Sequence, residues 1–244
     1  MQNRIKKSHG IIVDPIIITG IPRSGANIIA SVLDCSGALS GYDVHDSLRR
    51  GESFINNRIR NNIVRPFFKG RKASISGLEP FPDIAICKRV AEMVAPIWRR
   101  RILTILEKQQ SDPGQWFYKG SDACLVWPIW VKAFPEAKWI IVRRQTEDLV
   151  KACMNTGYMT GHTESSGWKL WIQHYLDRFS EIAKSATFVR HIWPERILQG
   201  KFDSLETLVH DVGLNWKGQK VHDSLAPILW TNGIYLMPIE MRGQ

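Results

Sequence analysis

The stretch IIITGIPRSGAN, Ile16–Asn27, predicts a strand, a loop and a helix start in immediate succession. Three isoleucines and a threonine form a β-branched run, which is typical of a strand buried on both faces of a parallel sheet. Two glycines then bound a loop that contains Arg23, and apolar residues at helical spacing continue to Leu33. This order of elements directs backbone N–H groups and the positive end of a helix dipole towards an anion.

Gly20 and Gly25 have the spacing of the nucleotide-triphosphate P-loop, G-x-x-x-x-G-K-[ST]. Ala26 stands at the position of the P-loop lysine, and Asn27 stands at the position of the hydroxyl residue that binds Mg²⁺. We therefore expect neither ordinary ATP or GTP hydrolysis nor a metal site. Arg23 instead places a permanent cation in the loop, and its planar guanidinium group binds phosphate or sulfate oxygens in pairs. The loop therefore predicts an anion cradle that needs no metal.

Two later segments also predict strands that end in polar or basic residues. The sequence KWIIVRR, Lys138–Arg144, predicts a strand with two arginines at its end, and a helical pattern follows over Gln145–Cys153. The segment Trp116–Tyr118 predicts a shorter strand, which ends in Lys119–Asp122. Open α/β sheets bind their ligands at the carboxyl ends of the strands. The arginine-ended strand with its helix start therefore predicts a second anion site.

The glycine loop resembles a motif of the PAPS-dependent sulfotransferases. GIPRSGAN matches their G-x-P-R-S-G-[TS]-[ST] loop, except that Ala26 and Asn27 replace two hydroxyl residues. The resemblance implies a three-layer α/β P-loop-like fold, with a central and mostly parallel sheet flanked by helices. It also implies that the loop cradles the 5′-phosphosulfate of 3′-phosphoadenosine 5′-phosphosulfate (PAPS), with the residues Pro22, Arg23, Ser24, Gly25, Ala26 and Asn27.

Two further stretches are similar to functional segments of the same family. FPEAKWIIVRRQTEDLVKA, residues 134–152, resembles F-P-x-A-K-x-[IV]-x-[IV]-x-R-N-P-x-D-x-x-x-S, which holds the 3′-phosphate of PAPS. The resemblance assigns this role to Arg144 and Ala152, although the alanine lacks the hydroxyl group of the family's serine. WFYKGSD, residues 116–122, is similar to the strand that carries catalytic-site groups, and this implies an assisting role for Lys119.

A glycine-bounded loop, GALSGYDVHDSLRRG at residues 37–51, supplies the candidates for a general base. Its D-V-H sequence is similar to an E-V-H stretch of the heparan-type sulfotransferases, in which the acidic residue acts as base. We expect Asp43 or His45 to take the proton of the acceptor, since histidine titrates near neutrality and a carboxylate can orient it. Asp46 and Asp122 stay open as alternatives.

Length and charge set the wider expectations. The chain of 244 residues, 44% of them hydrophobic, fits a single domain over 1–244. Its formal net charge of +10 favours an anionic ligand, an anionic acceptor or nucleic acid. Much of the excess lies between Arg49 and Lys72, where Glu52 is the one acidic residue. We interpret residues 49–82 as an irregular basic insertion with a short helix, a candidate element of acceptor specificity.

The remaining patterns predict helices and a reduced interior. Helical periodicity predicts helices over Ile86–Gln109 and Lys201–Trp216. An aromatic stripe over Trp168–Ile182 predicts a helix that faces the core. The rest of the chain beyond Cys153 also has helical patterns. Four scattered cysteines predict reduced thiols rather than disulfides or zinc. No segment has the length of a membrane span, so we expect a cytoplasmic protein without a membrane partner.

The sequence therefore favours a sulfotransferase that moves a sulfonate group from PAPS to a hydroxyl or amine and releases 3′-phosphoadenosine 5′-phosphate. The expected acceptor is a small molecule or a carbohydrate, and the basic insertion favours an anionic one. Two rivals remain: an atypical P-loop kinase, and a nucleic-acid or polyanion binder that uses the basic insertion. An inactive sulfotransferase is a further alternative, because Ala26, Asn27 and Ala152 lack hydroxyl groups.

Overall fold

The computed structural model describes residues 15–39, 54–74, 78, 80–108, 114–157 and 159–231 of the chain. Within them, the strands form one parallel sheet in the order β2-β1-β3-β4. The strands are β1 (Ile16–Gly20), β2 (Phe117–Lys119), β3 (Lys138–Val142) and β4 (Phe188–Ile192). Ile18 of β1 pairs with Lys119 of β2 and with Ile140 of β3. The glycine loop therefore leaves the sheet between its two neighbouring strands.

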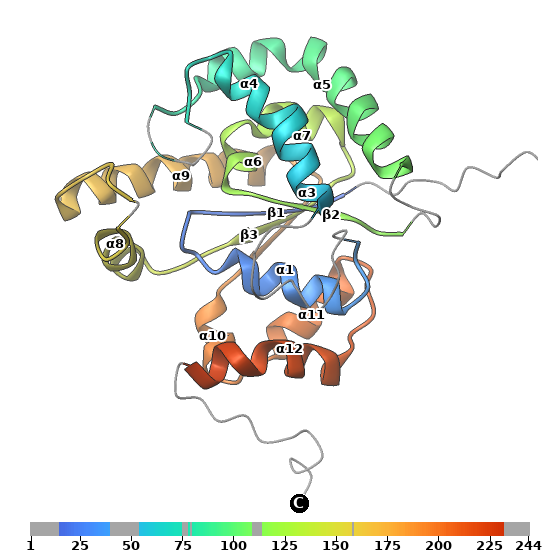
Figure 1. Ribbon diagram of the computed structural model, residues 1–244, viewed down its shortest axis with the longest axis vertical. Helices are drawn as coiled ribbons and strands as arrows, with labels where there is room; N and C mark the ends of the chain where they lie inside the picture. Colours follow the sequence, from blue (N-terminus) through green and yellow to red (C-terminus); the bar gives the residue numbers. More distant parts are fainter. Residues whose placement is uncertain are drawn as a thin grey trace, which may run out of the picture.

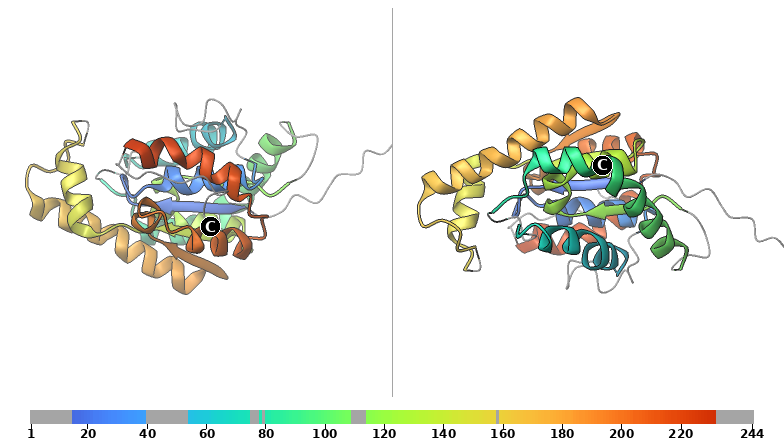
Figure 2. Two further views of the ribbon diagram at one scale, coloured as in Figure 1. Left: turned by 90° about the horizontal axis from the view of Figure 1, so that it is seen from below. Right: turned by 90° about the horizontal axis from the view of Figure 1, so that it is seen from above.

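Helices cover both faces of this sheet (Figure 1). Successive residues of β1 point to opposite faces, so Ile17 lies in one hydrophobic core while Ile16 and Ile18 lie in the other. The first face is covered by α3 (Phe54–Ile59), α5 (Ile84–Glu107), α6 (Ser121–Leu125), α7 (Trp127–Ala133) and α9 (Ser165–Ser185). The second is covered by α1 (Ala26–Cys35), α11 (Asp203–Asp211) and α12 (Gly218–Thr231), as both views of Figure 2 confirm. The expected three-layer α/β architecture is therefore confirmed.

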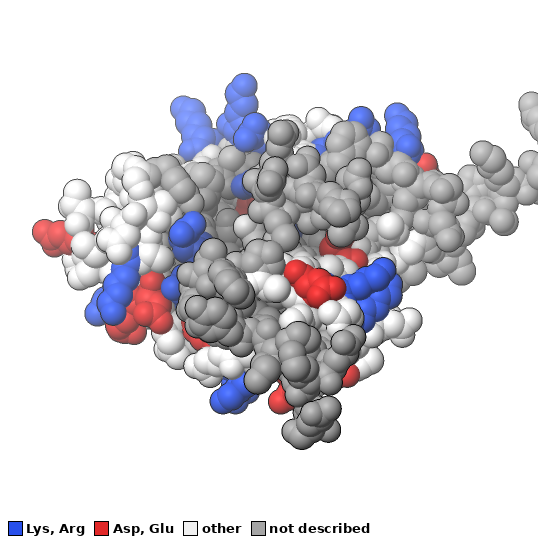
Figure 3. Space-filling model, turned by 60° about the horizontal axis from the view of Figure 1, so that its bottom comes forward, with Lys and Arg blue, Asp and Glu red and all other residues white. Residues whose placement is uncertain are grey.

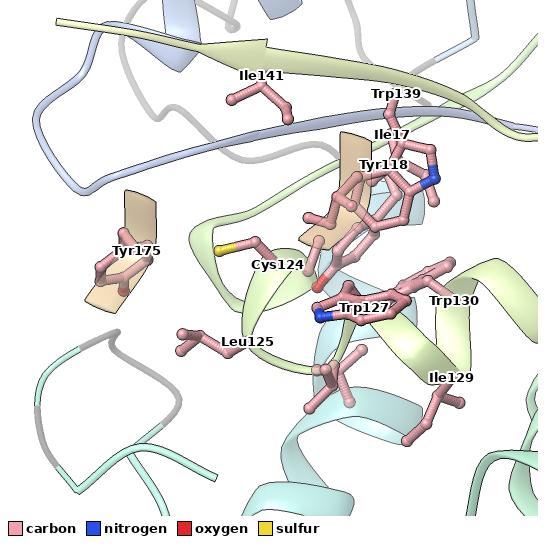
Figure 4. Close-up of a cluster of buried hydrophobic side chains, with 14 of the residues drawn as sticks. Ile17, Tyr118, Cys124, Leu125, Trp127, Ile129, Trp130, Trp139, Ile141 and Tyr175 are labelled. Carbon is pink, nitrogen blue, oxygen red and sulfur yellow. The ribbon is translucent and has the colours of Figure 1, made fainter. Parts of the chain in front are cut away.

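Aromatic rings pack among aliphatic side chains in the first core (Figure 4). Trp130 of α7 stacks on Tyr118 of β2 with ring centroids 4.7 Å apart, and it stacks on Phe134 at 6.1 Å. Trp98 of α5 meets the same indole edge-on at 5.6 Å. The stripe on α9 is also buried, as its spacing predicted, with Trp168, Trp171, Tyr175, Phe179 and Ile182 facing the core.

The segment expected to be irregular is helical over much of its length. Residues 54–69 form α3, a π-helical turn η1 (Arg60–Val64) and α4 (Arg65–Lys69) without a break. Its buried side chains recur every four residues, at Ile55, Ile59, Ile63 and Phe67. A regular α-helix would rotate such a stripe by about 40° per turn. The wider π-helical turn offsets this rotation and keeps the stripe on the core, which explains why a search for a 3.6-residue period does not find the helix.

The fourth strand is a second difference from the sequence prediction, which treated this region as helical. Among the described strands, β4 pairs with β3 alone, and most of its residues are partly or fully exposed, with Ile192 buried. An edge strand of this kind lacks the continuous apolar run of a central parallel strand. The last two helices to be placed are α8 (Thr146–Met154) and α10 (Pro194–Leu198), which begin shortly after β3 and β4. None of the described helices is both long and apolar enough to cross a bilayer.

The four cysteines are free thiols, as expected. Cys87, Cys124 and Cys153 are buried, and burial raises their pKa to about 11, about 12 and about 11. Cys35 is partly exposed, although burial of part of its side chain also raises the pKa of this thiol. The reactive form of cysteine is the thiolate, so a raised pKa lowers reactivity at any pH below it.

We expect a thiol reagent at pH 8 to label Cys35 first and the three buried cysteines only after unfolding. A thiol with a pKa near 11 has roughly 0.1% thiolate at pH 8, against roughly a quarter for an unperturbed one. Mass spectrometry after brief labelling, with and without denaturant, measures this order. Fast labelling of Cys124 in the folded protein would contradict the described packing.

Candidate functional site

A cleft of about 720 Å³ opens at the carboxyl ends of β1, β2 and β3. This size falls within the roughly 300–1,000 Å³ of small-molecule sites. The lining comes from the glycine loop, the ends of β2 and β3, the start of α10 and the π-helical turn. The residues are Gly20, Ile21, Pro22, Arg23, Ser24, Gly25, Ala26, Asn27, Ile28, Arg60, Lys119, Gly120, Ser121, Arg144, Pro194 and Glu195.

The glycine loop has a constrained backbone. A Cβ on Gly20 would lie 2.8 Å from the carbonyl oxygen of Val142 and against the hydroxyl of Ser24, so only glycine fits between β1 and β3. Gly25 caps α1 with φ of 91°, and Arg23 has φ of 74°, a left-handed value that side chains rarely adopt. Residues held in such conformations cluster at ligand sites. The hydroxyl of Ser24 is buried and has no hydrogen-bond partner, which leaves one polar group available beneath the loop.

Lys119 reaches from the end of β2 to the glycine loop. Its Nζ donates a hydrogen bond to Oδ1 of Asn27 at 2.5 Å. Its backbone is fixed by the buried side chain of Asn56, whose Nδ2 donates to the Lys119 carbonyl at 2.6 Å and whose Oδ1 accepts from the Lys119 N–H at 2.8 Å. The lysine therefore lies beside the residue that replaces the P-loop hydroxyl.

Arg144 connects the second predicted anion site to the first. Its Nη1 donates a hydrogen bond to the backbone carbonyl of Arg23 at 2.9 Å, although the two residues are 121 positions apart. Both arginines line the same cleft. Ala152 does not line it, since it lies further along α8, where its carbonyl accepts a hydrogen bond from Thr156.

Glu195 is a cleft residue that the sequence analysis missed. One of its carboxylate oxygens accepts a hydrogen bond from the N–H of Gln145 at the start of α8, at 3.3 Å, and the other is buried without a hydrogen-bond partner. A carboxylate thus stands at the helix start where an anion site was expected. Among the described lining residues it is the one acid beside four cations, Arg23, Arg60, Lys119 and Arg144.

Arg60 and Asp122 form a second group that the sequence analysis did not bring together. Asp122 is fully buried, and its Oδ2 lies 3.3 Å from Nε of Arg60 and accepts a hydrogen bond from the Tyr118 hydroxyl at 3.0 Å. Burial raises the pKa of Asp122, while Arg60 and the tyrosine act in the opposite direction. Asp122 does not line the cleft, which argues against it as the base.

The four-residue spacing of Asn56 and Arg60 is the signal that would have placed both on one helix face.

The candidate bases from the sequence lie elsewhere in the chain. Asp43, His45 and Asp46 fall outside the described residues.

Comparison with known proteins identifies the fold. No protein-family model matches the sequence, and no curated protein matches it. Among solved structures, sulfotransferase STF9 from Mycobacterium avium is similar, with a TM-score of 0.52 and 16% sequence identity over 91% of this chain and 69% of that chain. The chain has a sulfotransferase-like fold. Sulfotransferase STF1 from Mycobacterium tuberculosis H37Rv matches at a TM-score of 0.49 and 13% identity, over 95% of this chain and 75% of that chain. At these identities the likeness concerns the fold, and function has to be argued from the cleft.

Proposed function

We propose that this protein is a metal-independent sulfotransferase that moves a sulfonate group from PAPS to a hydroxyl or amine of an acceptor. The observation that carries the proposal is the hydrogen bond from Arg144 to the Arg23 carbonyl, which brings two cationic strand ends into one cleft. A sulfonate-donor molecule with two separate anionic groups needs two cationic binding positions of this kind. PAPS has a 3′-phosphate at one end and a 5′-phosphosulfate at the other.

The lining residues fit these two groups. In our proposal, the loop around Arg23, Ser24 and Asn27 holds the phosphosulfate, with the unpartnered Ser24 hydroxyl as one donor. Arg144 binds the 3′-phosphate, and this contact distinguishes PAPS from ATP. Ala152 was expected to assist Arg144, but it does not line the cleft, so we propose Arg144 as the principal 3′-phosphate contact.

The proposed transfer needs charge stabilisation more than covalent catalysis. The acceptor atom forms a bond to sulfur while the bond between sulfur and the bridging oxygen breaks. The bridging oxygen keeps the electron pair and becomes a phosphate oxygen of 3′-phosphoadenosine 5′-phosphate. Arg23 and Lys119 stabilise that developing charge, and the acceptor's proton passes to Asp43 or His45, which we retain as the proposed base.

Isothermal titration with 3′-phosphoadenosine 5′-phosphate (PAP) tests the proposal. We expect PAP to bind without added metal, and adenosine 5′-phosphate, which lacks the 3′-phosphate, to bind more weakly. Arg144→Ala should weaken PAP binding by roughly 10- to 100-fold, because a hydrogen bond to a charged group contributes about 1.5–3 kcal/mol. The same substitution should change the binding of adenosine 5′-phosphate little, since the missing phosphate is the group that Arg144 holds.

Arg100→Ala is the matched control, because Arg100 is an exposed residue of α5 outside the cleft and its loss changes the net charge equally. We expect this variant to bind PAP as the wild type does. Absence of PAP binding by the wild type, or equal losses in both variants, would contradict the proposal. Binding of ATP with Mg²⁺ in place of PAP would favour an atypical kinase.

The polyanion-binding alternative predicts a different response. On the face shown in Figure 3, lysine and arginine side chains stand in separate groups with acidic residues among them. Within the described residues, the cleft itself brings together four cations, Arg23, Arg60, Lys119 and Arg144. Salt-dependent binding of single-stranded nucleic acid that persists after Arg23→Ala would support the alternative.

A further inference from the structure

Arg60 is the one described cleft residue that comes from the helical segment 54–69. It is the first residue of the π-helical turn η1, and its side chain is 23% exposed. Such turns are frequent at functional sites. Asn56, one turn earlier, ties the same segment to the backbone of Lys119. The position of Arg60 over the cleft is therefore fixed to the end of β2.

Asp122 holds the Arg60 side chain through a contact with its guanidinium group. Its buried Oδ2 holds Nε of Arg60 at 3.3 Å, and the Tyr118 hydroxyl holds the same oxygen at 3.0 Å. An arginine beside Lys119 and Arg23 meets like charges, which would turn a free side chain away from the cleft. A buried carboxylate behind the guanidinium group opposes this repulsion. Asp122 is thus a positioning residue, because it acts through Arg60 and does not line the cleft.

The order of the strands places Arg60 at a particular end of the cleft. β1 lies between β2 and β3, so the glycine loop separates Lys119 and Ser121 on one side from Arg144 on the other. Arg60 lies with the β2 group, through its contact with Asp122 and through Asn56. If Arg144 holds the 3′-phosphate and the loop holds the 5′-phosphosulfate, the terminal sulfonate points towards β2.

We infer that Arg60, positioned by Asp122, binds the sulfonate oxygens of PAPS and makes the cleft select PAPS over its product PAP. This inference rests on the proposed function. It adds a residue from the basic insertion to the donor site, and it gives the buried carboxylate a role in donor selection. The guanidinium group suits this task because its planar N–H donors bind two oxygens of a tetrahedral anion at once.

Paired titrations with PAPS and PAP test the inference without an acceptor. Arg60→Gln should weaken PAPS binding at least about tenfold, which corresponds to about 1.4 kcal/mol, and PAP binding less than about threefold. Arg60→Lys keeps the positive charge but loses the planar pair of N–H donors. Its affinity for PAPS should therefore lie between those of the wild type and Arg60→Gln. Asp122→Asn should also lower the preference for PAPS while PAP binding persists. Arg58→Gln, in α3 and outside the cleft, should change neither affinity.

The outcomes separate the inference from the proposed function. Suppose that the wild type binds both PAP and PAPS. If Arg60→Gln then weakens the two affinities equally, or changes neither of them, the inference is overturned and the proposed function stands. If wild type binds neither compound, both are overturned. Thermal unfolding of each variant shows whether it is folded. Should Asp122→Asn unfold, the two Arg60 variants decide the result, since Arg60 is partly exposed and Arg60→Lys keeps a cation beside Asp122.

Discussion

Trp130→Ala is expected to lower the free energy of unfolding by about 3–5 kcal/mol, the usual cost of truncating a buried aromatic residue. Trp130 is fully buried and packs against three rings, those of Tyr118, Phe134 and Trp98. Tyr118 belongs to β2, Phe134 follows α7 and Trp98 belongs to α5. The cavity would therefore lie where three parts of the first core meet. Urea unfolding followed by far-UV circular dichroism measures the loss as a lower midpoint at an unchanged slope.

Trp130→Phe is the matched control. The indole Nε1 of Trp130 is buried without a hydrogen-bond partner, so phenylalanine keeps an aromatic ring and removes a polar group that contributes no bond. We expect this variant to lose about 1–2 kcal/mol, less than the alanine variant, because the smaller ring leaves a smaller cavity. Equal losses for alanine and phenylalanine would contradict the described stacking. Because Tyr118 holds Asp122, the alanine variant should also lose part of its preference for PAPS.

Gly20→Ala is expected to destabilise the fold by about 1–3 kcal/mol and to weaken PAP binding at least about tenfold. An added Cβ would approach the carbonyl oxygen of Val142 to 2.8 Å. This oxygen belongs to the backbone of the neighbouring strand β3, which pairs with β1 in register and cannot move alone. The Cβ would also meet the hydroxyl of Ser24, so the loop would shift together with the strand end.

Gly157→Ala provides the comparison for this prediction. An added Cβ at Gly157 meets no atom within 4 Å, so we expect a change within about 0.5 kcal/mol and unaltered PAP binding. Thermal unfolding and isothermal titration of both variants measure the two effects. A Gly20→Ala protein with wild-type stability and affinity would show that β1 and β3 do not approach as closely as described.

Local sequence patterns were sufficient to predict the strands and helices whose buried residues recur at a regular, short spacing. The β-branched runs of β1 and β3 and the aromatic stripe of α9 lie where the sequence predicted them, and α5 begins and ends within two residues of its predicted bounds. The patterns failed where burial is partial or the period is unusual. β4 is a half-exposed edge strand, and residues 54–69 repeat every four residues around a π-helical turn.

The residues of the candidate site also fall into two groups, those that the sequence predicted and those that it did not. Arg23 and Arg144 were found because each follows a recognisable strand and precedes a helix start. Asn56, Arg60 and Glu195 were not, because their roles depend on partners distant in sequence. Asn56 holds Lys119 across 63 positions, and Glu195 meets Gln145 across 50. No local pattern encodes such a contact, since it arises only when the helical segment and the strand ends are packed together.

The sequence alone determined the strand β1 and the glycine loop that follows it, because chain-local propensity and glycine geometry specify both within a dozen residues. Tertiary structure decided that this loop and Arg144 line one cleft, through the pairing of β1 with β3 and the hydrogen bond from Arg144 to the Arg23 carbonyl. It also decided that the buried carboxylate of Asp122 lies 3.3 Å from Arg60, a residue that lines the same cleft. The physical reason is that burial and charge pairing depend on which surfaces meet, and sheet order sets this only after the chain has folded.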